Sequence, residues 1–544
     1  MKLKYLCILS LFFCNAFYGL QAQSVDWIKQ KKIAPGSLAH AGDDEQYHYL
    51  LANNVSFIKV NKKSLASELI YKYDLKKLGK KTAHSLPFKI GDSWVIFSRF
   101  GPTKKSKAAG LCYRKLKGGD VTERVALLDH TSEMPKKMQE RRAKFTGYSV
   151  YKINQSIRQS PNRAYTMIDY SYAFEDKLVV LVLDDQLNVV YEKDVPLQLD
   201  KDGQSISVSY KFFDIDNDGN LSMIGRSYPD KEASPSRSYV SISTYDRAKD
   251  KMSHRIETVD IDASTVAAPG LYCFGKGQSE VYNDEKGSTK QYSSFNVEKG
   301  EFAIAGMYYT KDGGGTYITR INLADTEGVQ TTKIPFSATL LDKIKEAMGT
   351  KKLNKTLKGG IQPSNIVWKK DGSLLVFYGY DHSVLQVFAP NHTNRDPNGS
   401  MTDTKARAVI YLNISSEGKL TFSGALYDVP RKSDIYLFTP LATRADGNKV
   451  SFILPHLWKI DGGGGFAQGV IDEDGNVTAD FLKAQEGSPR INSLMVTMKY
   501  GFNTHFLMDF FKHLPESQFT DDKRYFFYPA ERGGNKKGFV RLTM

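Results

Sequence analysis

Residues 205–221 read SISVSYKFFDIDNDGNL and contain the two signals that decide the fold. Apolar and polar side chains alternate at the start of this stretch, which places Ile206, Val208, Tyr210 and Phe212 on one face. A period of two is typical of a strand that is buried on one side. Asp218-Gly219 follows and favours a tight hairpin turn, because Gly adopts a positive φ and Asp caps the turn. The stretch therefore predicts two strands joined by a hairpin.

The same two signals recur along the chain. Leu178 to Leu183 is a continuous apolar run, too short for an ordinary helix, and it predicts a strand that is covered on both faces. Further strands are predicted over residues 239–245, 316–323, 374–380, 408–412 and 449–454. Acidic-Gly turns occur at Asp218-Gly219, Asp312-Gly313, Asp371-Gly372, Glu417-Gly418, Asp446-Gly447 and Asp474-Gly475. This pattern indicates antiparallel hairpins through most of the chain.

The predicted strands fall into groups of three or four. These groups cover residues 46–75, 86–128, 147–196, 205–260, 280–336, 364–427, 434–482 and 493–544. In a chain of 544 residues, repetition of such units favours an all-β protein, a β-propeller, over one sandwich or barrel. The first and last groups are incomplete and are expected to combine into one blade. That gives about seven blades and leaves six and eight open.

Helix is expected only in one or two short insertions. Ser337 can cap a helix near 337–349, and Gly349 can end it. Its apolar stripe contains Leu340, Leu341, Ile344 and Met348. A second candidate lies near 133–145. Residues 23–544 are otherwise expected to form a single propeller domain.

One segment resembles a group of known proteins. It contains Ser160-Pro161-Asn162, the apolar run 178–183, the stretch Leu187 to Lys193 and the turn Asp214 to Leu221. This order of motifs resembles exported, propeller-like bacterial proteins of unassigned function. The resemblance covers residues 160–225 and implies a propeller fold and export, but no catalytic residue. The Trp-Asp, kelch and sialidase-box signatures of other propellers are absent from the sequence.

The first 22 residues have the form of a secretory signal peptide. Lys2 and Lys4 precede an uncharged, mostly apolar run from Tyr5 to Leu20, and Ala22 suits a cleavage site. The run is shorter than the roughly 20 residues of a spanning helix, which favours a cleaved signal at 1–22 over an anchor. No second such run follows. The mature chain is expected to be exported, periplasmic, on the cell surface or extracellular, with no membrane span. Whether Cys112 and Cys273 pair is open.

Basic residues outnumber acidic residues, with 75 Lys and Arg against 60 Asp and Glu and a formal net charge of +15. Three clusters hold much of the excess: Lys104, Lys105 and Lys107; Lys136, Lys137, Arg141, Arg142 and Lys144; and Lys351, Lys352, Lys355 and Lys358. In an exported protein such clusters favour an envelope protein or an anionic glycan as partner, and not nucleic acid. A solvated basic face without a specific partner is the alternative.

Asp214, Asp216 and Asp218 form the most specific candidate site in the sequence. Carboxylates at alternate positions before a Gly can surround one calcium ion. The ligand set is incomplete, because Gly225 occupies the twelfth position, where a calcium loop of the EF-hand type needs Glu. The sequence leaves open a calcium loop and a plain Asp-rich turn. No other cofactor is expected.

Familiar catalytic signatures are absent from the sequence, including Gly-x-Ser-x-Gly, His-Glu-x-x-His and Cys-x-x-Cys. His40 and His48 are eight residues apart, as are His505 and His513, and this spacing matches no common metal motif. The sequence therefore favours a non-catalytic binding or scaffold module of the cell envelope. The alternative is a polysaccharide hydrolase or lyase with acid and base residues on blade loops around the central channel.

Aromatic residues and long loops are weaker candidates for binding. Trp94, Trp368 and Trp458 are expected to pack between sheets, although tryptophans can also stack on sugars. The polar loops at 226–238 and 390–404 are better places for contacts, because loops on a rigid scaffold often carry function.

Overall fold

The structure is a computed structural model. It describes residues 25–29, 38–52, 56–73, 83–100, 110–117, 119–129, 157–172, 177–229, 237–260, 292–296, 299–310, 313–323, 329–348, 361–380, 408–427, 435–437, 442–458, 464–481, 525–532 and 536–543. The signal peptide expected at 1–22 and the helix expected near 133–145 lie outside these residues.

Within the described residues, antiparallel strands form eight sheets. The sheet that we call the closing sheet contains β1 (Val25–Lys29), β34 (Lys536–Thr543) and β33 (Tyr525–Arg532). The next sheet contains β2 (Leu38–Asp43), β3 (Tyr47–Ala52), β4 (Ser56–Asn61) and β5 (Ser67–Lys72). It is followed by a sheet of β6 (Ala83–Ile90), β7 (Ser93–Phe100), β8 (Gly110–Lys117), β9 (Asp120–Val121) and β10 (Val125–Asp129).

The central part of the chain forms three sheets. The first contains β11 (Ile157–Gln159), β12 (Tyr165–Tyr172), β13 (Lys177–Asp184) and β14 (Val189–Pro196). The second contains β15 (Gln198–Lys201), β16 (Gln204–Ile215), β17 (Leu221–Pro229), β18 (Arg237–Asp246) and β19 (Lys251–Asp260). The third contains β20 (Tyr292–Asn296), β21 (Glu301–Thr310), β22 (Gly313–Asn322) and β23 (Val329–Pro335).

Two further sheets precede the C-terminal strands. One contains β24 (Ile361–Trp368), β25 (Leu374–Tyr380), β26 (Ala408–Ile414) and β27 (Leu420–Tyr427). The other contains β28 (Ile435–Leu437), β29 (Ala442–Asp446), β30 (Lys449–Trp458), β31 (Gly464–Ile471) and β32 (Val477–Phe481). In it β28 and β29 pair with successive parts of β30 and act as one interrupted edge strand.

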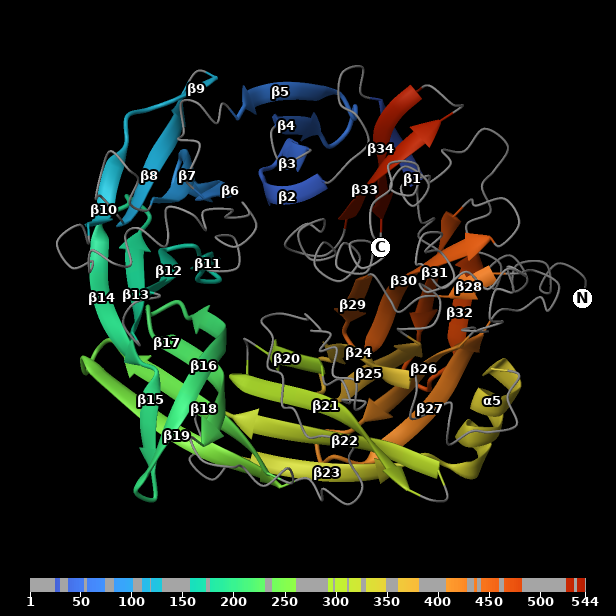
Figure 1. Ribbon diagram of the computed structural model, residues 1–544. Coiled ribbons are helices and arrows are strands. Elements are labelled where there is room, and N and C mark those ends of the chain that lie inside the picture. Colours follow the sequence, from blue (N-terminus) through green and yellow to red (C-terminus); the bar gives the residue numbers. More distant parts are fainter. Residues whose placement is uncertain are drawn as a thin grey trace, which may run out of the picture.

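The sheets are arranged in a ring around a common centre (Figure 1), and within the β2–β5 sheet β2 lies nearest that centre. Strands from the two ends of the chain share the closing sheet, because β1 pairs with β34 and places Trp27 opposite Val540. The protein is therefore all-β and has propeller architecture. The sequence pattern predicts this fold and the joining of N- and C-terminal strands.

The strands that close the ring differ from those expected. Residues 38–72 already form a complete four-stranded sheet, and β1 is the strand that joins the C-terminal ones. The expected first group, at 46–75, missed β1 and β2. β2 reads Leu-Ala-His-Ala-Gly-Asp, a segment with weak strand propensity. The described residues form eight sheets, and the number of blades stays a prediction.

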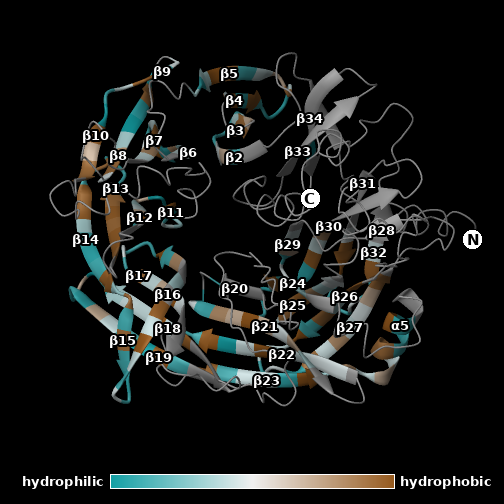
Figure 2. Cartoon of the chain, in the orientation of Figure 1, coloured by the Kyte–Doolittle hydropathy of each residue, from teal (hydrophilic) through white to brown (hydrophobic). Residues whose placement is uncertain are grey.

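The apolar run of β13 lies between two hydrophobic clusters. Leu178, Val180 and Val182 belong to a cluster shared with the β15–β19 sheet, whereas Leu181 and Leu183 belong to one shared with the β6–β10 sheet. None of the six residues from 178 to 183 is more than 5% exposed. The prediction of a strand covered on both faces is confirmed, and Figure 2 shows β13 as hydrophobic beside the more polar β14.

A β-bulge changes the face pattern of β16. Ile206, Val208 and Tyr210 are buried as the alternation predicts. The register with β17 then shifts between Tyr210 and Phe212, and the same cluster continues with Phe213 and Ile215. An inserted residue moves the following side chains to opposite faces, so a strict period of two could not locate them.

The acidic-Gly turns are confirmed wherever both residues are described. Gly219, Gly372, Gly418, Gly447 and Gly475 all have a positive φ, between 63° and 84°. Several of these turns form three-residue loops, such as the one in which Asp216 N donates to Asn220 O and Gly219 N donates to Asp216 O. At Asp312-Gly313 the turn lies partly outside the described residues.

The predicted helix near 337–349 is confirmed as α5 (Ala338–Met348). Ser337 caps it, because the Leu340 amide donates to Ser337 Oγ at 3.2 Å. Leu340 and Ile344 are buried in a cluster with residues of the β24–β27 sheet. Among the described residues no helix is long and apolar enough to cross a membrane.

Hairpin turns of neighbouring sheets meet on one face of the ring. The Asn162 amide donates to Asn217 Oδ1 at 2.9 Å, and the Lys370 amide donates to Gly447 O at 3.1 Å. Arg320 donates to Gly372 O and Ser415 O of the next sheet. We call this the turn face; its short turns lie at residues 44–46, 62–66, 91–92, 161–164, 185–188, 216–220, 247–250, 369–373, 415–419, 447–448 and 472–476.

Candidate functional site

The β2–β3 hairpin brings two histidines and an aspartate together. A register shift between His40 and Gly42 interrupts the pairing of β2 with β3, after which Asp43 lies opposite His48. The bulge allows His40, three residues before Asp43, to contact the same carboxylate. His40, Asp43 and His48 are the group that we call the His-Asp-His cluster.

The two imidazoles converge on one carboxylate oxygen. His40 Nε2 lies 3.1 Å and His48 Nδ1 lies 2.7 Å from Asp43 Oδ1. The imidazoles are buried, with side-chain exposures of 3% and 0%, whereas the Asp43 side chain is 23% exposed. Access from solvent to the cluster is therefore through Asp43.

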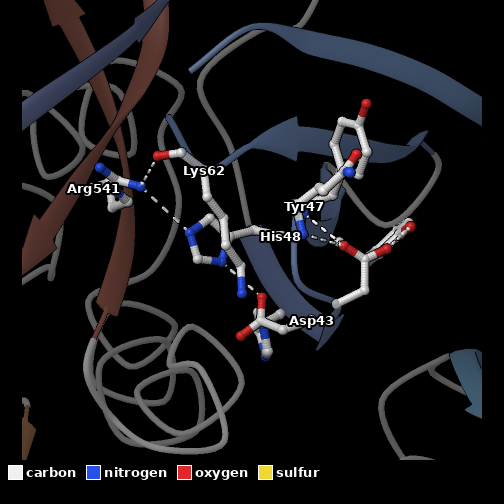
Figure 3. A network of polar contacts seen from close by, with 9 residues as sticks. Asp43, Tyr47, His48, Lys62 and Arg541 are labelled. Carbon is white, nitrogen blue, oxygen red and sulfur yellow. Dashed lines mark hydrogen bonds and ion pairs between the residues drawn. The ribbon is translucent and has the colours of Figure 1, made fainter. Parts of the chain in front are cut away.

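A residue of the closing sheet reaches the cluster from the opposite end of the chain (Figure 3). Arg541, on β34, has its Nη1 3.4 Å from His48 Nε2, and the same nitrogen donates to Lys62 O at 2.8 Å. Lys62 follows β4 in the turn toward β5. The cluster is thus built at the junction where the ring closes.

The environment makes Asp43 an anion and keeps His48 neutral. Burial by itself raises the pKa of the Asp43 carboxyl, but hydrogen bonds and charge from His40 and His48 outweigh burial and hold the pKa below its ordinary value. Burial lowers the pKa of His48, and Arg541 and Lys62 lower it further, while Asp43 opposes them. The Asp43 carboxylate is therefore a partly exposed anion between two buried imidazoles.

The partners of His48 fix its tautomer. A guanidinium has only donors, so the His48 Nε2 that faces Arg541 acts as an acceptor. Nδ1 then carries the proton and donates it to Asp43 Oδ1. Asp44, the next residue, does not join the cluster, because its carboxylate accepts bonds from the amides of Gln46 and Tyr47 and from the Tyr49 hydroxyl.

Sequence spacing alone missed this cluster. A separation of eight positions between His40 and His48 matches no helical or loop metal motif, but in a hairpin residues on two strands can lie side by side. The bulge at Gly42 adds the shift that brings Asp43 between them. A signal was present in the His-Ala-Gly-Asp segment, since Gly after alternating residues often marks a bulge.

The aspartates predicted to bind calcium lie at the β16–β17 turn. Both carboxylate oxygens of Asp216 accept hydrogen bonds from within the turn, from the Asp218 and Asn220 amides and from Asn220 Nδ2. Asp214 is buried at the end of β16, and Asp218 is exposed. Among the described residues, the His-Asp-His cluster is the group of three ligand-type side chains whose atoms converge, within 4.8 Å. The calcium loop stays a prediction.

The same turn structure occurs at two other places. Asp184 and Asn188, and Asp472 and Asn476, repeat the contacts of Asp216 and Asn220 to within about 0.1 Å. The first of these turns has neither Gly nor alternating aspartates and uses Leu187 at a φ of 72°. An Asp and an Asn four residues apart therefore account for the turn geometry without an ion.

The motifs behind the family resemblance meet at one junction. Asn162 contacts Asn217, the Tyr191 hydroxyl donates to Gly219 O, and the Arg247 guanidinium lies over the Tyr165 ring. All of these contacts join the β11–β14 sheet to the β15–β19 sheet. The shared motifs have a structural role at this junction.

The other candidates from the sequence either contact neighbouring residues of the fold or lie outside the described residues. Trp94 packs on Tyr49 and Phe57 with ring centroids 4.6 and 4.9 Å away, and the Arg320 guanidinium lies 5.5 Å from the Trp368 ring. Cys112 is buried and its thiol contacts Ser98 O; burial raises the pKa of this thiol to about 11. The side chain of Trp458, Cys273, the three basic clusters, the loop at 390–404 and residues 230–236 lie outside the described residues.

Comparisons with known proteins find weak similarity to several solved structures. No protein-family model and no curated protein matches this chain. Among solved structures, it is similar to the β-propeller domain of the Trilobed protease from Pyrococcus furiosus, at 10% identity over 82% of this chain and 95% of that chain, with a TM-score of 0.32. It is also similar to the WD40 domain of SCAP from fission yeast, at 8% identity over 96% and 98% of the chains and a TM-score of 0.24.

A third neighbour is a larger enzyme. Prolyl oligopeptidase B from Galerina marginata aligns at 8% identity over 82% of this chain, with a TM-score of 0.33. The alignment covers only 50% of the oligopeptidase, so this chain spans about half of its length. With TM-scores of 0.24 to 0.33, nothing about this chain is inferred from these proteins.

Proposed function

We propose that the protein is an exported, non-catalytic β-propeller that binds an anionic glycan of the cell envelope. The observation that carries the proposal is the contrast between the two faces of the ring. On the turn face, short turns bond to one another between sheets. The opposite face is where β8, β11 and β24 begin, and the segments that lead into them contain the three basic clusters.

Physical chemistry supports an acidic polymer as the ligand. Several clusters of one sign raise the local concentration of an oppositely charged partner through long-range attraction. Long segments on a rigid scaffold are also the usual place for binding residues. The turn face would then have a structural role, which is to hold neighbouring sheets together.

The His-Asp-His cluster does not provide the site that the hydrolase or lyase alternative requires. A glycosidase needs two carboxyl groups on either side of the bond that breaks. In the His-Asp-His cluster Asp43 is the single carboxylate, and the neighbouring Asp44 is engaged by its own turn. The hydrolase or lyase alternative would therefore need a carboxyl pair elsewhere in the chain.

Binding of the mature chain to immobilised polygalacturonate and to neutral dextran tests the proposal. We expect salt-sensitive retention on the acidic polymer only, and no release of shortened or unsaturated products. The combined replacement of Lys351, Lys352, Lys355 and Lys358 by Gln is expected to reduce retention. The matched control replaces four exposed lysines of the turn face, Lys63, Lys249, Lys370 and Lys419.

The controls separate the alternatives. Equal retention of both variants, or no retention of the unmodified chain at low salt, would contradict the proposal. Capture of an envelope protein without glycan binding would favour a protein partner. Appearance of cleaved polymer would favour the enzyme.

A further inference from the structure

We propose that His40, Asp43 and His48 bind one divalent transition-metal ion of the zinc class at the junction that closes the ring. The ligand atoms of the three side chains lie within 4.8 Å of one another. Nothing in the glycan-binding proposal requires this site, and its test is independent.

The donor set matches the chemistry of such ions. Two imidazole nitrogens and one carboxylate oxygen suit zinc, cobalt and nickel, whereas calcium and magnesium prefer sets made of oxygen atoms. Three protein ligands leave a fourth position for water or an external ligand. The 23% exposure of the Asp43 side chain provides a path for the ion.

The fold holds the ligands in place before an ion arrives. The bulge at His40/Gly42 and the pairing of Asp43 with His48 set the backbone. Both imidazoles are buried and oriented toward the same carboxylate oxygen. Little side-chain entropy remains to be lost, so ordering the ligands costs less than in a mobile loop.

Metal binding and the Arg541 contact compete with each other. An ion on His48 Nδ1 takes the place of the proton that Nδ1 donates to Asp43, and a neutral ring must then carry its proton on Nε2. Nε2 faces the Arg541 guanidinium at 3.4 Å, so two donors would point at each other. Metal binding is therefore expected to weaken the contact between Arg541 and His48, and Arg541 is expected to weaken metal binding.

Metal titration of the full mature chain, first stripped with a chelator, tests the site. Calorimetry with Zn²⁺ and visible absorption with Co²⁺ are expected to show one equivalent bound. His40→Gln and His48→Gln are each expected to weaken binding by about tenfold or more, since an imidazole ligand is lost. His254→Gln is the matched control, because His254 lies outside the cluster and is bonded to Ser243.

The competition between Arg541 and the metal ion can be tested separately, by measuring Zn²⁺ affinity in an Arg541 variant. Arg541→Gln is expected to tighten Zn²⁺ binding by up to about tenfold, because it removes a cation and a donor from the far side of His48. A purely structural role of Arg541 would weaken binding or leave it unchanged. Zn²⁺ is also expected to raise the melting temperature of the unmodified chain and of His254→Gln, but not of His40→Gln.

Three results would overturn the inference. They are no stoichiometric binding by the unmodified chain, undiminished binding in both His40→Gln and His48→Gln, and equal loss in the His254→Gln control. Weaker binding in Arg541→Gln would overturn the competition. If His48→Gln does not fold, His40→Gln decides the result, because the contact that Arg541 makes across the closing junction is to His48.

Discussion

Two junctions between sheets are held together in different ways. Between the β11–β14 and β15–β19 sheets a continuous apolar cluster fills the space, with Val180, Val182, Tyr210 and Met223 among its buried members. At the closing junction, Arg541 makes polar contacts with Lys62 and His48. The first junction should respond to changes in volume, and the second to changes in charge, protonation or metal.

The largest expected effect is a loss of volume at the first junction. Met223 is fully buried, and Met223→Ala is expected to lower the free energy of unfolding by about 2–5 kcal/mol. Val189→Ala on the outer strand β14 is the control, because Val189 is 50% exposed and should change stability by less than about 0.5 kcal/mol. Denaturant unfolding measures both. Equal effects would mean that this core does not hold the junction.

The next largest loss of stability is expected from Gly219→Ala, at the same junction. An Ala there would adopt a φ of +82°, and its Cβ would lie 3.2 Å from Arg247 Cδ. Gly203→Ala carries a similar φ of +76° but meets no atom within 4 Å. Both changes should cost about 1–2 kcal/mol for the left-handed backbone.

Crowding against Arg247 and Tyr165 is expected to add roughly 1 kcal/mol to Gly219→Ala alone. The difference between the melting temperatures of the two variants measures this packing term. Identical melting temperatures would show that the junction accommodates the added methyl group without loss of stability.

The closing junction is expected to respond locally to loss of charge. Arg541→Gln removes the charged donor from Lys62 O and should cost about 1.5–3 kcal/mol. Hydrogen exchange should rise in β1 and β34 and stay unchanged in β13. Lys63→Gln, an equal charge change at an exposed neighbour, is expected to leave exchange unaltered. Faster exchange throughout the ring would instead indicate a global loss of stability.

The smallest effect concerns pH at the first junction. His254 lies 2.7 Å from Ser243 Oγ, and burial lowers the pKa of this histidine. Its folded-state pKa is below the unfolded value, so its contribution is present above pH 6.5 and is lost as pH falls below it. His254→Gln should therefore reduce the decline in melting temperature between neutral and mildly acidic pH. An unchanged decline would assign the pH dependence to other groups.

The sequence predicts most of the regular structure because strands and turns are local. The run from Leu178 to Leu183 and the Gly-containing turns fix their own conformations, and α5 has a cap and an apolar stripe. Predictions failed where one residue changes a register. The β16 bulge and the weak strand β2 could not be recognised from a period of two.

The candidate site could not be predicted for the same reason. His40, Asp43 and His48 meet because of a bulge and a hairpin, and Arg541 comes from nearly 500 residues away in the chain. Pairing over such separations depends on tertiary structure and leaves no spacing pattern. The clustered basic residues, by contrast, are visible in the sequence, whereas the face of the ring on which β8, β11 and β24 begin follows only from the strand order.

The pairing of β1 with β34 has a consequence for how the chain matures. Each of the other sheets can assemble from consecutive residues as they emerge during synthesis, but the last one waits until both extremities are available. Until then β1 has no partner within the described closing sheet. The ring is still open, and its unpaired edge strands can pair with another molecule. Ring completion is thus expected to be the slow, concentration-sensitive step of folding.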